Sequence, residues 1–551
     1  YYTEGRSAAK ITSGRSIDKN GNEYKLNSED IKTLTPSQES QYFDKSGKTI
    51  SAKIPGVKTG SILEYTYEIE TYNPFDKHIF SGGWYFQDNI PVVKSEYHII
   101  YPKEKKINIM FRNLPESFRK PVRKNSDDTF IIDTYKMEDV PPIYPEPYMP
   151  NISDVKYSLN YTFLEDRNYL YEYISKIQKE RLIAGDKIKS LVDSIKQKSY
   201  SDTQLMADLF HWVETNIRYV SVKSSVSSGW SGHPAEETFI NKFGDCTDVS
   251  ILYCAMLNYA GIEAYPVIIN TNDAGELITD IPVPDGNHCI TEIRYKGNIF
   301  YVDPTSETYR FPYLRSDDNG VKAVNYIKKE IGYTGLANPD NNQKKSNLEI
   351  EFDISGNAEC SIINTYTGPY EAQVRNSWRH IKKQDTAKVM QNYVSSITPT
   401  AVFKNFNISD LMDLNMPLKM AIQFEASNMW EKAGDLFIVK IPTIEKKFDE
   451  IGLEKRKYDI HYNSTSSRIN SIKIKFPKNH SIKFFPDNLI ISNDFFEYSG
   501  EFTLKNNFTV EFNEIFIIKQ RIIPAEKYQE FKNGLQKISE FSQNRIFIKT
   551  I

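Results

Sequence analysis

The chain has 551 residues, too many for one hydrophobic core, so two to four domains are expected. Its 69 Lys and Arg nearly balance 72 Asp and Glu, and this net charge of −3 gives no electrostatic basis for binding nucleic acid. Aromatic residues make up 13% of the chain, which favours folded, strand-rich structure, and no apolar run approaches the ~20 residues that span a bilayer. We therefore expect a folded protein without an integral membrane segment.

Alternating apolar residues dominate the N-terminal part of the chain. The stretch GSILEYTYEIETY (60–72) places Leu63, Tyr65, Tyr67 and other large residues on one face, and SEYHIIYP (95–102) repeats the pattern. A period of two predicts half-buried, antiparallel strands. Five prolines between residues 140 and 150 then predict an extended segment near a domain edge. We expect an antiparallel, sandwich-like β domain over residues 1–165.

A helical period begins near residue 168. Residues 201–220 open with a capping box formed by Ser201 and Gln204 and continue with apolar residues at helical spacing. A second helix is expected to begin near Cys246 and to end at Gly261, a residue suited to a helix C-terminus. Strands are then predicted at residues 264–270, 288–295 and 298–304. Together these elements predict a compact α+β domain over residues 166–336.

Alternation returns after a polar linker (337–347), so residues 337–551 are expected to form a β-rich domain with helical insertions. The predicted elements are strands at 348–354, 470–476 and 508–512, a helical segment at 369–395 and a final helix at 524–541. The overall prediction is an α+β multidomain protein in which two β-rich domains flank a helix-containing core.

The stretch KFGDCTDVSILYC (242–254) places Cys246 at an expected helix start. Cys254 would lie about 12 Å further along the same helix, too far for a disulfide, so we expect Cys246 to be a free thiol. Unpaired N–H groups at a helix N-terminus favour a thiolate, although the neighbouring Asp245 and Asp248 oppose it by charge. A nearby imidazolium would support the thiolate more strongly.

His288 and Asp303 complete a possible catalytic triad with this cysteine. His288 begins one predicted strand and Asp303 ends the next, so an antiparallel pairing would bring the two side chains together. The carboxylate would orient the ring and favour the imidazolium, which would hold Cys246 as a thiolate. Taken singly, the three residues are more often a core cysteine, a strand histidine and a turn former. Their order along the chain carries the prediction.

The sequence resembles the bacterial transglutaminase-like proteins, which have a papain-like fold. The resemblance rests on HPAEETFINKFGDCTDVSILYCAMLNYAGIEAYPVII, NHCI and YVDPT, and it covers about residues 168–335. It implies that Cys246 is the nucleophile, His288 the base and Asp303 the residue that orients it. Many relatives have a lysine where this chain has Thr247, and losing that cation removes support for a thiolate. The N-terminal part also resembles the uncharacterised β domain that often precedes such cores.

Further residues around the site are weaker candidates. The backbone N–H of Cys246 is the natural first donor to an oxyanion, and Trp230 is a second candidate through its indole N–H, although it would more often pack on a domain edge. His233 and Asn287 are expected near the cleft as shaping residues. The sequence has no CxxC pair and no HExxH, so we expect no metal and no cofactor.

Two functions follow from these residues. The first is thiol-dependent acyl transfer on the carboxamides of a peptide or protein, ending in hydrolysis or in transamidation. The alternative is a non-catalytic envelope protein that keeps a papain-like groove for peptides or glycans, or serves a purely structural role. The β-rich flanks, the start at Tyr1 and the family resemblance lead us to expect a periplasmic or cell-surface location.

Overall fold

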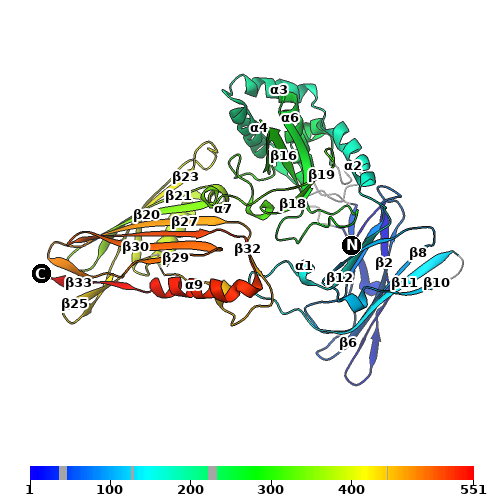
Figure 1. The fold of residues 1–551 in the computed structure, drawn as a ribbon, viewed down its shortest axis with the longest axis horizontal. Helices are drawn as coiled ribbons and strands as arrows, with labels where there is room; N and C mark the ends of the chain where they lie inside the picture. Colours follow the sequence, from blue (N-terminus) through cyan, green and yellow to red (C-terminus); the bar gives the residue numbers. More distant parts are fainter. Residues whose placement is uncertain (36–45, 126–128, 221–231, 443–444) are drawn as a thin grey trace.

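The computed structural model describes residues 1–35, 46–125, 129–220, 232–442 and 445–551. It has a β-rich N-terminal part, a central part with helices packed on a sheet, and a β-rich C-terminal part, which confirms the predicted fold class (Figure 1). None of the helices in the described ranges is long and apolar enough to cross a membrane.

The N-terminal part consists of small antiparallel sheets. Their strand orders are β1-β5-β4, β3-β2-β6, β10-β11-β8 and β7-β12-β9. The strands are β1 (Tyr2–Thr3), β2 (Ser7–Ile17), β3 (Glu23–Lys25), β4 (Ile31–Leu34), β5 (Gly47–Ala52), β6 (Ile62–Thr71), β7 (Ser81–Tyr85), β8 (Val92–Pro102), β9 (Asn108–Arg112), β10 (Val122–Asn125), β11 (Phe130–Val140) and β12 (Ser158–Thr162), with the short helix α1 (Ile152–Val155) before β12. One core includes Ile99, Tyr101 and Tyr135 from β8 and β11 and Leu159 from β12. The alternation of apolar residues at 95–102 therefore predicted correctly which side chains of this strand are buried.

The strand at 62–71 differs from the prediction. Every residue of β6 is exposed, including Leu63, Tyr65, Tyr67 and Ile69. The expectation that this strand is half-buried is wrong. Its sheet has three strands, and the apolar face of β6 is not covered by a second layer among the described residues. Alternation identifies residues that share a face, whereas burial depends on what packs against it.

The central part is built around one buried helix, α6. It contains α2 (Asn168–Arg181), α3 (Asp186–Lys196), α4 (Asp202–Asn216), β13 (Arg218–Tyr219), α5 (Ala235–Asn241), β14 (Phe243–Gly244), α6 (Cys246–Ala260), β15 (Glu263–Ile269), β16 (His288–Tyr295), β17 (Asn298–Val302), β18 (Lys322–Asn325) and β19 (Glu330–Tyr333). The five-stranded sheet has the order β17-β16-β15-β18-β19, and α6 packs on β15 and β16. Residues Val249 to Leu257 of α6 are all buried, as in a helix enclosed on every side.

The C-terminal part combines an eight-stranded sheet with a four-stranded one. Their orders are β22-β23-β21-β20-β27-β31-β30-β29 and β24-β25-β33-β28, and β26 pairs with β32. The elements are β20 (Gln343–Phe352), β21 (Ala358–Tyr366), α7 (Gly368–Arg379), α8 (Thr386–Ile397), β22 (Ala401–Ile408), β23 (Leu418–Ala426), β24 (Trp430–Ala433), β25 (Leu436–Lys440), β26 (Ile460–His461), β27 (Ser466–Lys475), β28 (His480–Phe484), β29 (Leu489–Ser492), β30 (Phe496–Asn506), β31 (Thr509–Ile518), β32 (Ile522–Ile523), α9 (Tyr528–Phe541) and β33 (Arg545–Thr550). The single helical segment expected at 369–395 is two helices, α7 and α8. The last helix, α9, lies along the large sheet and buries Phe531, Leu535 and Ile538 in its core (Figure 1).

Buried ion pairs join the central and C-terminal parts. Arg310, from the loop after β17, donates through Nε to both carboxylate oxygens of Glu371 on α7, at 2.9 and 2.8 Å. Arg375, one turn further along α7, donates to the same carboxylate and to carbonyl groups of the loop at 410–416. Because these charges are buried and mutually paired, they fix the position of α7 against the loop that follows Asp303.

Candidate active site

The helix that carries Cys246 begins with a reciprocal capping box. The side chain of Asp245 accepts hydrogen bonds from the N–H groups of Thr247 and Asp248, and Asp248 accepts one from the N–H of Asp245. Gly244 permits this close packing, because a Cβ atom there would lie 2.5 Å from Cβ of Asp248. The two acids that flank the cysteine therefore bind the helix start, and they fix Cys246 as the first residue of α6.

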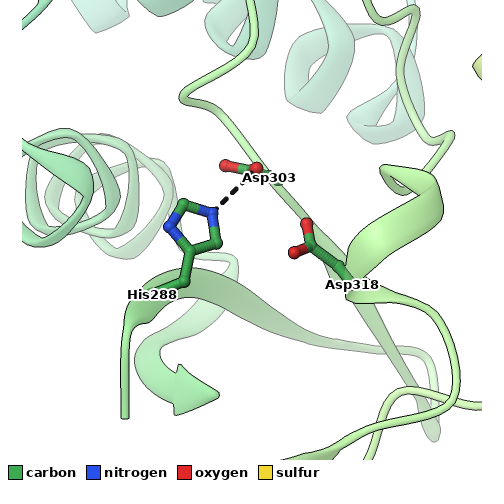
Figure 2. A group of neighbouring side chains, drawn as sticks. All are labelled: His288, Asp303 and Asp318. Atoms are coloured by element: carbon green, nitrogen blue, oxygen red, sulfur yellow. Dashed lines mark hydrogen bonds and ion pairs between the residues drawn. The ribbon is translucent and has the colours of Figure 1, made fainter. Parts of the chain in front are cut away.

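His288 and Asp303 meet at the ends of neighbouring strands. Strand β16 begins at His288, and it pairs antiparallel with β17, whose last residue immediately precedes Asp303. The ring Nε2 of His288 lies 3.0 Å from Oδ2 of Asp303 (Figure 2). Both side chains are buried, with relative exposures of 8% and 1%. Thr305 completes the environment of Asp303 by donating to Oδ1 from its N–H and its Oγ1, at 2.9 and 2.7 Å.

The electrostatics of this cluster favour a charged histidine. Burial opposes the charge on His288, but the attraction and hydrogen bond of Asp303, and a hydrogen bond to the side chain of Cys246, raise the pKa of His288 well above its ordinary value. Burial likewise opposes ionisation of Asp303, but His288, Arg315 and Thr305 hold the pKa of Asp303 well below its usual range. The ring of His288 thus interacts with both Asp303 and Cys246, and the electrostatics of the buried pair favour a charged His288 and a charged Asp303.

Two further ionisable residues of this cluster were not predicted from the sequence. Nη1 of Arg315 lies 3.5 Å from Oδ2 of Asp303, and Nη2 of the same guanidinium binds Asp317 at 2.5 Å. Asp318 is fully buried beside His288 and Asp303 (Figure 2), and within the described ranges neither of its carboxylate oxygens has a hydrogen-bond partner. Burial and the charge of Asp303 raise the pKa of Asp318 well above its usual range, so this carboxyl group is held neutral. Both residues lie at a short 3-10 helix (Ser316–Asp318) in a segment without apolar periodicity, where sequence patterns carry no signal.

Residues His288, Asp303 and Asp318 are also spaced like metal ligands, because one donor atom of each lies within 4.8 Å of the others. Two observations oppose a cation site. The ring nitrogen already binds Asp303, and the Arg315 guanidinium brings a positive charge to the same carboxylate. The donor set therefore fits a buried ion pair between His288 and Asp303 better than a cation site.

A cavity of about 150 Å³ opens at the thiol. Cys246, Thr247 and His288 form one wall, and the segment from Pro284 to Asn287 forms another, while Ile174, Ile268 and Tyr326 supply apolar surface. Gly286 has a φ of +141° in this segment, and a Cβ atom there would lie 2.1 Å from Cγ2 of Ile268. Only glycine therefore lets this segment approach the sheet and leave the cavity open.

The other predicted residues have different positions. Asn287 lines the cavity, and its side-chain amide is fixed by hydrogen bonds with the N–H and Oγ1 of Thr271 at 2.9 Å. His233 does not line it among the described residues. Its N–H and ring Nδ1 bind Oδ1 of Asp248, at 2.6 and 3.0 Å, so it supports the helix start. Trp230 lies outside the described residues. The remaining cysteines, Cys254, Cys289 and Cys360, are free and buried.

Sequence and structure comparisons agree with the three-part architecture. Residues 189–304 match the model of the transglutaminase-like superfamily. Residues 1–144 match DUF3857 and residues 435–548 match DUF3858, two domains of unknown function that have solved structures. No curated protein sequence matches the chain.

The solved structures that match the chain include the following two. A crystal structure of a "putative protease" from Parabacteroides distasonis superimposes with a TM-score of 0.69 at 13% identity, covering 100% of this chain and 90% of the other. A "putative cysteine protease" from Cytophaga hutchinsonii, at 15% identity, covers 41% of this chain and 78% of its own, with a TM-score of 0.21. At this level of identity the first match shows that the two chains share a fold.

Proposed function

Since the chain has a transglutaminase-like core between a DUF3857 and a DUF3858 domain, we propose that it is a thiol enzyme that transfers acyl groups from peptide or protein carboxamides. The observation that carries the proposal is the buried pair of His288 and Asp303, 3.0 Å apart, with the ring hydrogen-bonded to Cys246 at a helix start. A charged imidazole beside a thiol at a helix N-terminus stabilises the thiolate, the nucleophilic form of cysteine.

The proposed reaction proceeds through a thioester. Sγ of Cys246 attacks the carboxamide carbon, a C–S bond forms, and negative charge develops on the carbonyl oxygen. The backbone N–H of Cys246 is placed to donate to that oxygen. Nε2 of His288 is engaged by Asp303, which leaves Nδ1 to exchange a proton with the thiol and then to protonate the departing amine or ammonia. Asp303 fixes the orientation of the ring and keeps it basic.

The acceptor of the acyl group can be water or an amine. Attack of water on the thioester gives hydrolysis, as in a protease or amidase, and attack of a primary amine gives transamidation. In both cases His288 removes a proton from the acceptor and the thiolate of Cys246 leaves. The cavity of about 150 Å³ at the thiol is small enough to admit a single side chain, which suits a glutamine or asparagine carboxamide.

A second candidate function is a non-catalytic groove for peptides or glycans. One observation favours it: only 2% of Cys246 is exposed, so the thiol meets a substrate only in the narrow cavity. Thr247, which stands where many relatives have a lysine, also favours a non-catalytic groove because it adds no positive charge beside the thiol.

The two candidates are separated by measuring turnover of an unfolded protein substrate, reduced casein, in the presence of a fluorescent primary amine. Ammonia release, incorporation of the amine and chain cleavage are followed together. We expect at least one of these signals from the wild-type chain and none from Cys246→Ala. The matched control is Cys254→Ala, which removes a buried thiol from the same helix and should retain the signal. Equal signals from wild type and Cys246→Ala, or none from wild type, would contradict the enzyme proposal.

For the cellular location we propose the periplasm or the cell surface, on the basis of the β-rich flanking domains and the family resemblance. Fractionation of cells that express the natural gene with a C-terminal tag tests this. The tagged protein should leave the cell with the periplasmic fraction or become accessible to added protease. Recovery with cytoplasmic proteins alone would contradict the proposal.

A further inference from the structure

A second, larger cavity lies between the central and C-terminal parts of the molecule. Its volume is about 920 Å³, against about 150 Å³ for the cavity at Cys246. One wall is the segment 305–309, directly after Asp303, together with residues 315–317. The opposite wall is formed by one face of α7 and by the loop at 462–466. We call this cavity the interdomain cleft.

The interdomain cleft approaches the candidate active site on the side of Asp303, without sharing a lining residue with the cavity at Cys246. Arg315 lines the cleft and lies 3.5 Å from Asp303. Tyr219, the last residue of β13, also lines it, and burial together with the charges of Cys246 and Asp303 raises the pKa of Tyr219 above its usual range. A molecule bound in the cleft would therefore contact Arg315 and Tyr219, two side chains that interact with the residues of the candidate site.

Tyrosine, serine and amide side chains dominate the walls of the cleft. Tyr309 of the central part and Tyr370 and Tyr462 of the C-terminal part line it. Tyrosine offers a large, rigid surface with one polar atom, whereas serine and asparagine offer adaptable hydrogen bonds, a combination that suits recognition of polypeptide.

Two buried polar atoms of the cleft have no partner among the described residues. They are Oδ1 of Asn342 and Oγ of Ser464. The amide of Asn342 is fixed in orientation, because its Nδ2 donates to the carbonyl of Thr465 at 2.7 Å. Buried polar groups without partners are uncommon and destabilising. Both atoms are buried behind the wall of the cleft, so a ligand reaches them only if the side chains around them move.

Several charges in the cleft are already neutralised by neighbours. Asp317 binds Arg315 at 2.5 Å, and Glu307 binds Arg379 at 2.9 Å. These ion pairs reduce the electrostatic attraction between the cleft and a charged ligand. Asp273 also lines the cleft and is in neither pair, so the lining favours a polar ligand without negative charge.

We propose that the interdomain cleft binds an extended, uncharged segment of the polypeptide whose carboxamide reacts at Cys246. This inference rests on the proposed function and adds the place and the class of the bound segment. The cavity at the thiol accommodates one side chain, so the rest of a polypeptide substrate needs a separate surface. The cleft has the volume for several residues. Peptide N–H and C=O groups match the amide and hydroxyl side chains that line the cleft, and the C-terminal domain takes part in recognition through Gln373 and Asn376 of α7.

The test measures binding in full-length Cys246→Ala, so that chemistry is not required. The probe is a fluorescein-labelled 12-residue peptide of Gly, Ser, Asn, Gln and Tyr with blocked ends, and binding is followed by fluorescence anisotropy. Gln373→Trp fills the cleft from the exposed face of α7. Ser377→Trp is the matched control, because Ser377 is an exposed residue of the same helix that does not line the cleft. We expect Gln373→Trp to weaken binding at least tenfold and Ser377→Trp to change it less than twofold.

Competitors separate the possible ligands. An oligosaccharide, maltoheptaose or the tetramer of N-acetylglucosamine, should not displace the peptide, and a variant peptide with Asp or Lys at alternate positions should bind more weakly. Absence of peptide binding, equal binding by Gln373→Trp and Ser377→Trp, or binding of an oligosaccharide in place of the peptide would overturn the inference.

The proposed function is tested separately with a short amide, N-acetylglutamine amide, which is too small to reach the far end of the cleft. Turnover of this amide by the wild-type chain without peptide binding would overturn the cleft alone. Peptide binding without turnover of any substrate would overturn the enzyme proposal and leave the cleft as a peptide-binding site.

Discussion

Nη1 of Arg315 lies 3.5 Å from Oδ2 of Asp303, the same oxygen that lies 3.0 Å from the ring of His288. Asp303 therefore lies between two cationic partners in a buried setting, while Thr305 donates to its other oxygen. Two positive neighbours and two hydrogen-bond donors outweigh the cost of burying one carboxylate. The arrangement keeps Asp303 charged, and a charged Asp303 keeps His288 cationic.

Removal of Arg315 should weaken the electrostatic interactions that keep Asp303 and His288 charged. Arg315→Gln removes one of the groups that hold the pKa of Asp303 low, so the pKa of Asp303 should rise. We expect kcat for carboxamide turnover to fall by about tenfold, in the range of a perturbed acid–base residue. The acid limb of the pH–rate profile should also move to higher pH. Lys328→Gln, which removes a partly exposed cation of the same domain, should leave the profile in place. A lower rate with an unmoved acid limb would indicate that Arg315 acts only through substrate binding.

Iodoacetamide should distinguish Cys246 from the other three thiols. Burial raises the pKa of Cys254, Cys289 and Cys360 above their usual range, whereas Cys246 is hydrogen-bonded to a cationic ring and lines a cavity. At pH 6, low concentrations of the reagent should modify Cys246 first, as measured by peptide mass spectrometry. In His288→Asn the rate at Cys246 should fall at least tenfold, because the imidazolium that supports the thiolate is lost. Labelling of Cys360 as fast as Cys246 would contradict an activated thiol.

The stability contributed by His288 should depend on pH in a defined direction. The pKa of His288 is raised in the folded protein, so its contribution is complete below the unfolded value of about 6.5 and is lost as pH rises through the folded value. Wild type should therefore be more stable than His288→Gln at pH 5.5, and the difference should shrink toward pH 9. The difference in stability is measured by calorimetric unfolding of the wild type and His288→Gln across this pH range. A difference that grows with pH would show that His288 is neutral in the fold.

The sequence predicted the parts of the site that local patterns govern. Cys246 begins α6 and Gly261 ends it, as the run GDC and the apolar helix indicated, and β16 and β17 pair in the antiparallel manner expected from their alternation. Pairing of adjacent strands was enough to bring His288 to Asp303. Arg315 and Asp318 escaped prediction because they lie at a short 3-10 helix (Ser316–Asp318) in a segment without apolar periodicity, and only the folded chain places them beside His288 and Asp303.

Exposure of β6 was mispredicted for a different reason. Tyr67 and Tyr135 both lie in strands with alternating apolar residues, yet their relative exposures are 58% and 2%. Tyr135 faces a second sheet, whereas the face of β6 does not. Burial therefore depends on a long-range contact that period-two patterning does not encode.

These two tyrosines provide a matched test of that difference. Tyr67→Ser should change the free energy of unfolding by less than about 0.5 kcal/mol, because the ring is exposed. Tyr135→Ser should lower it by about 3–5 kcal/mol, because it leaves a cavity in the N-terminal core. The free energies of unfolding of the two variants and the wild type are measured by calorimetry. If Tyr67→Ser lowers the free energy of unfolding as much as Tyr135→Ser does, the exposed face of β6 is covered by another surface in solution.

Replacing Asp318 with the neutral residue asparagine should stabilise the protein at neutral pH. Burial and the charge of Asp303 raise its pKa, so the folded protein holds the carboxyl group protonated while the unfolded chain ionises it above pH ~4. Folding then becomes less favourable as pH rises above that value, and Asp318→Asn removes this dependence. We expect the variant to unfold with a free energy about 1–3 kcal/mol higher at pH 7, with the gain vanishing near pH 4. Turnover should change little, because the neutral amide replaces a neutral acid beside His288. If Asp318→Asn instead abolishes turnover and destabilises the chain at pH 7, the carboxylate is ionised and takes part in holding the imidazolium.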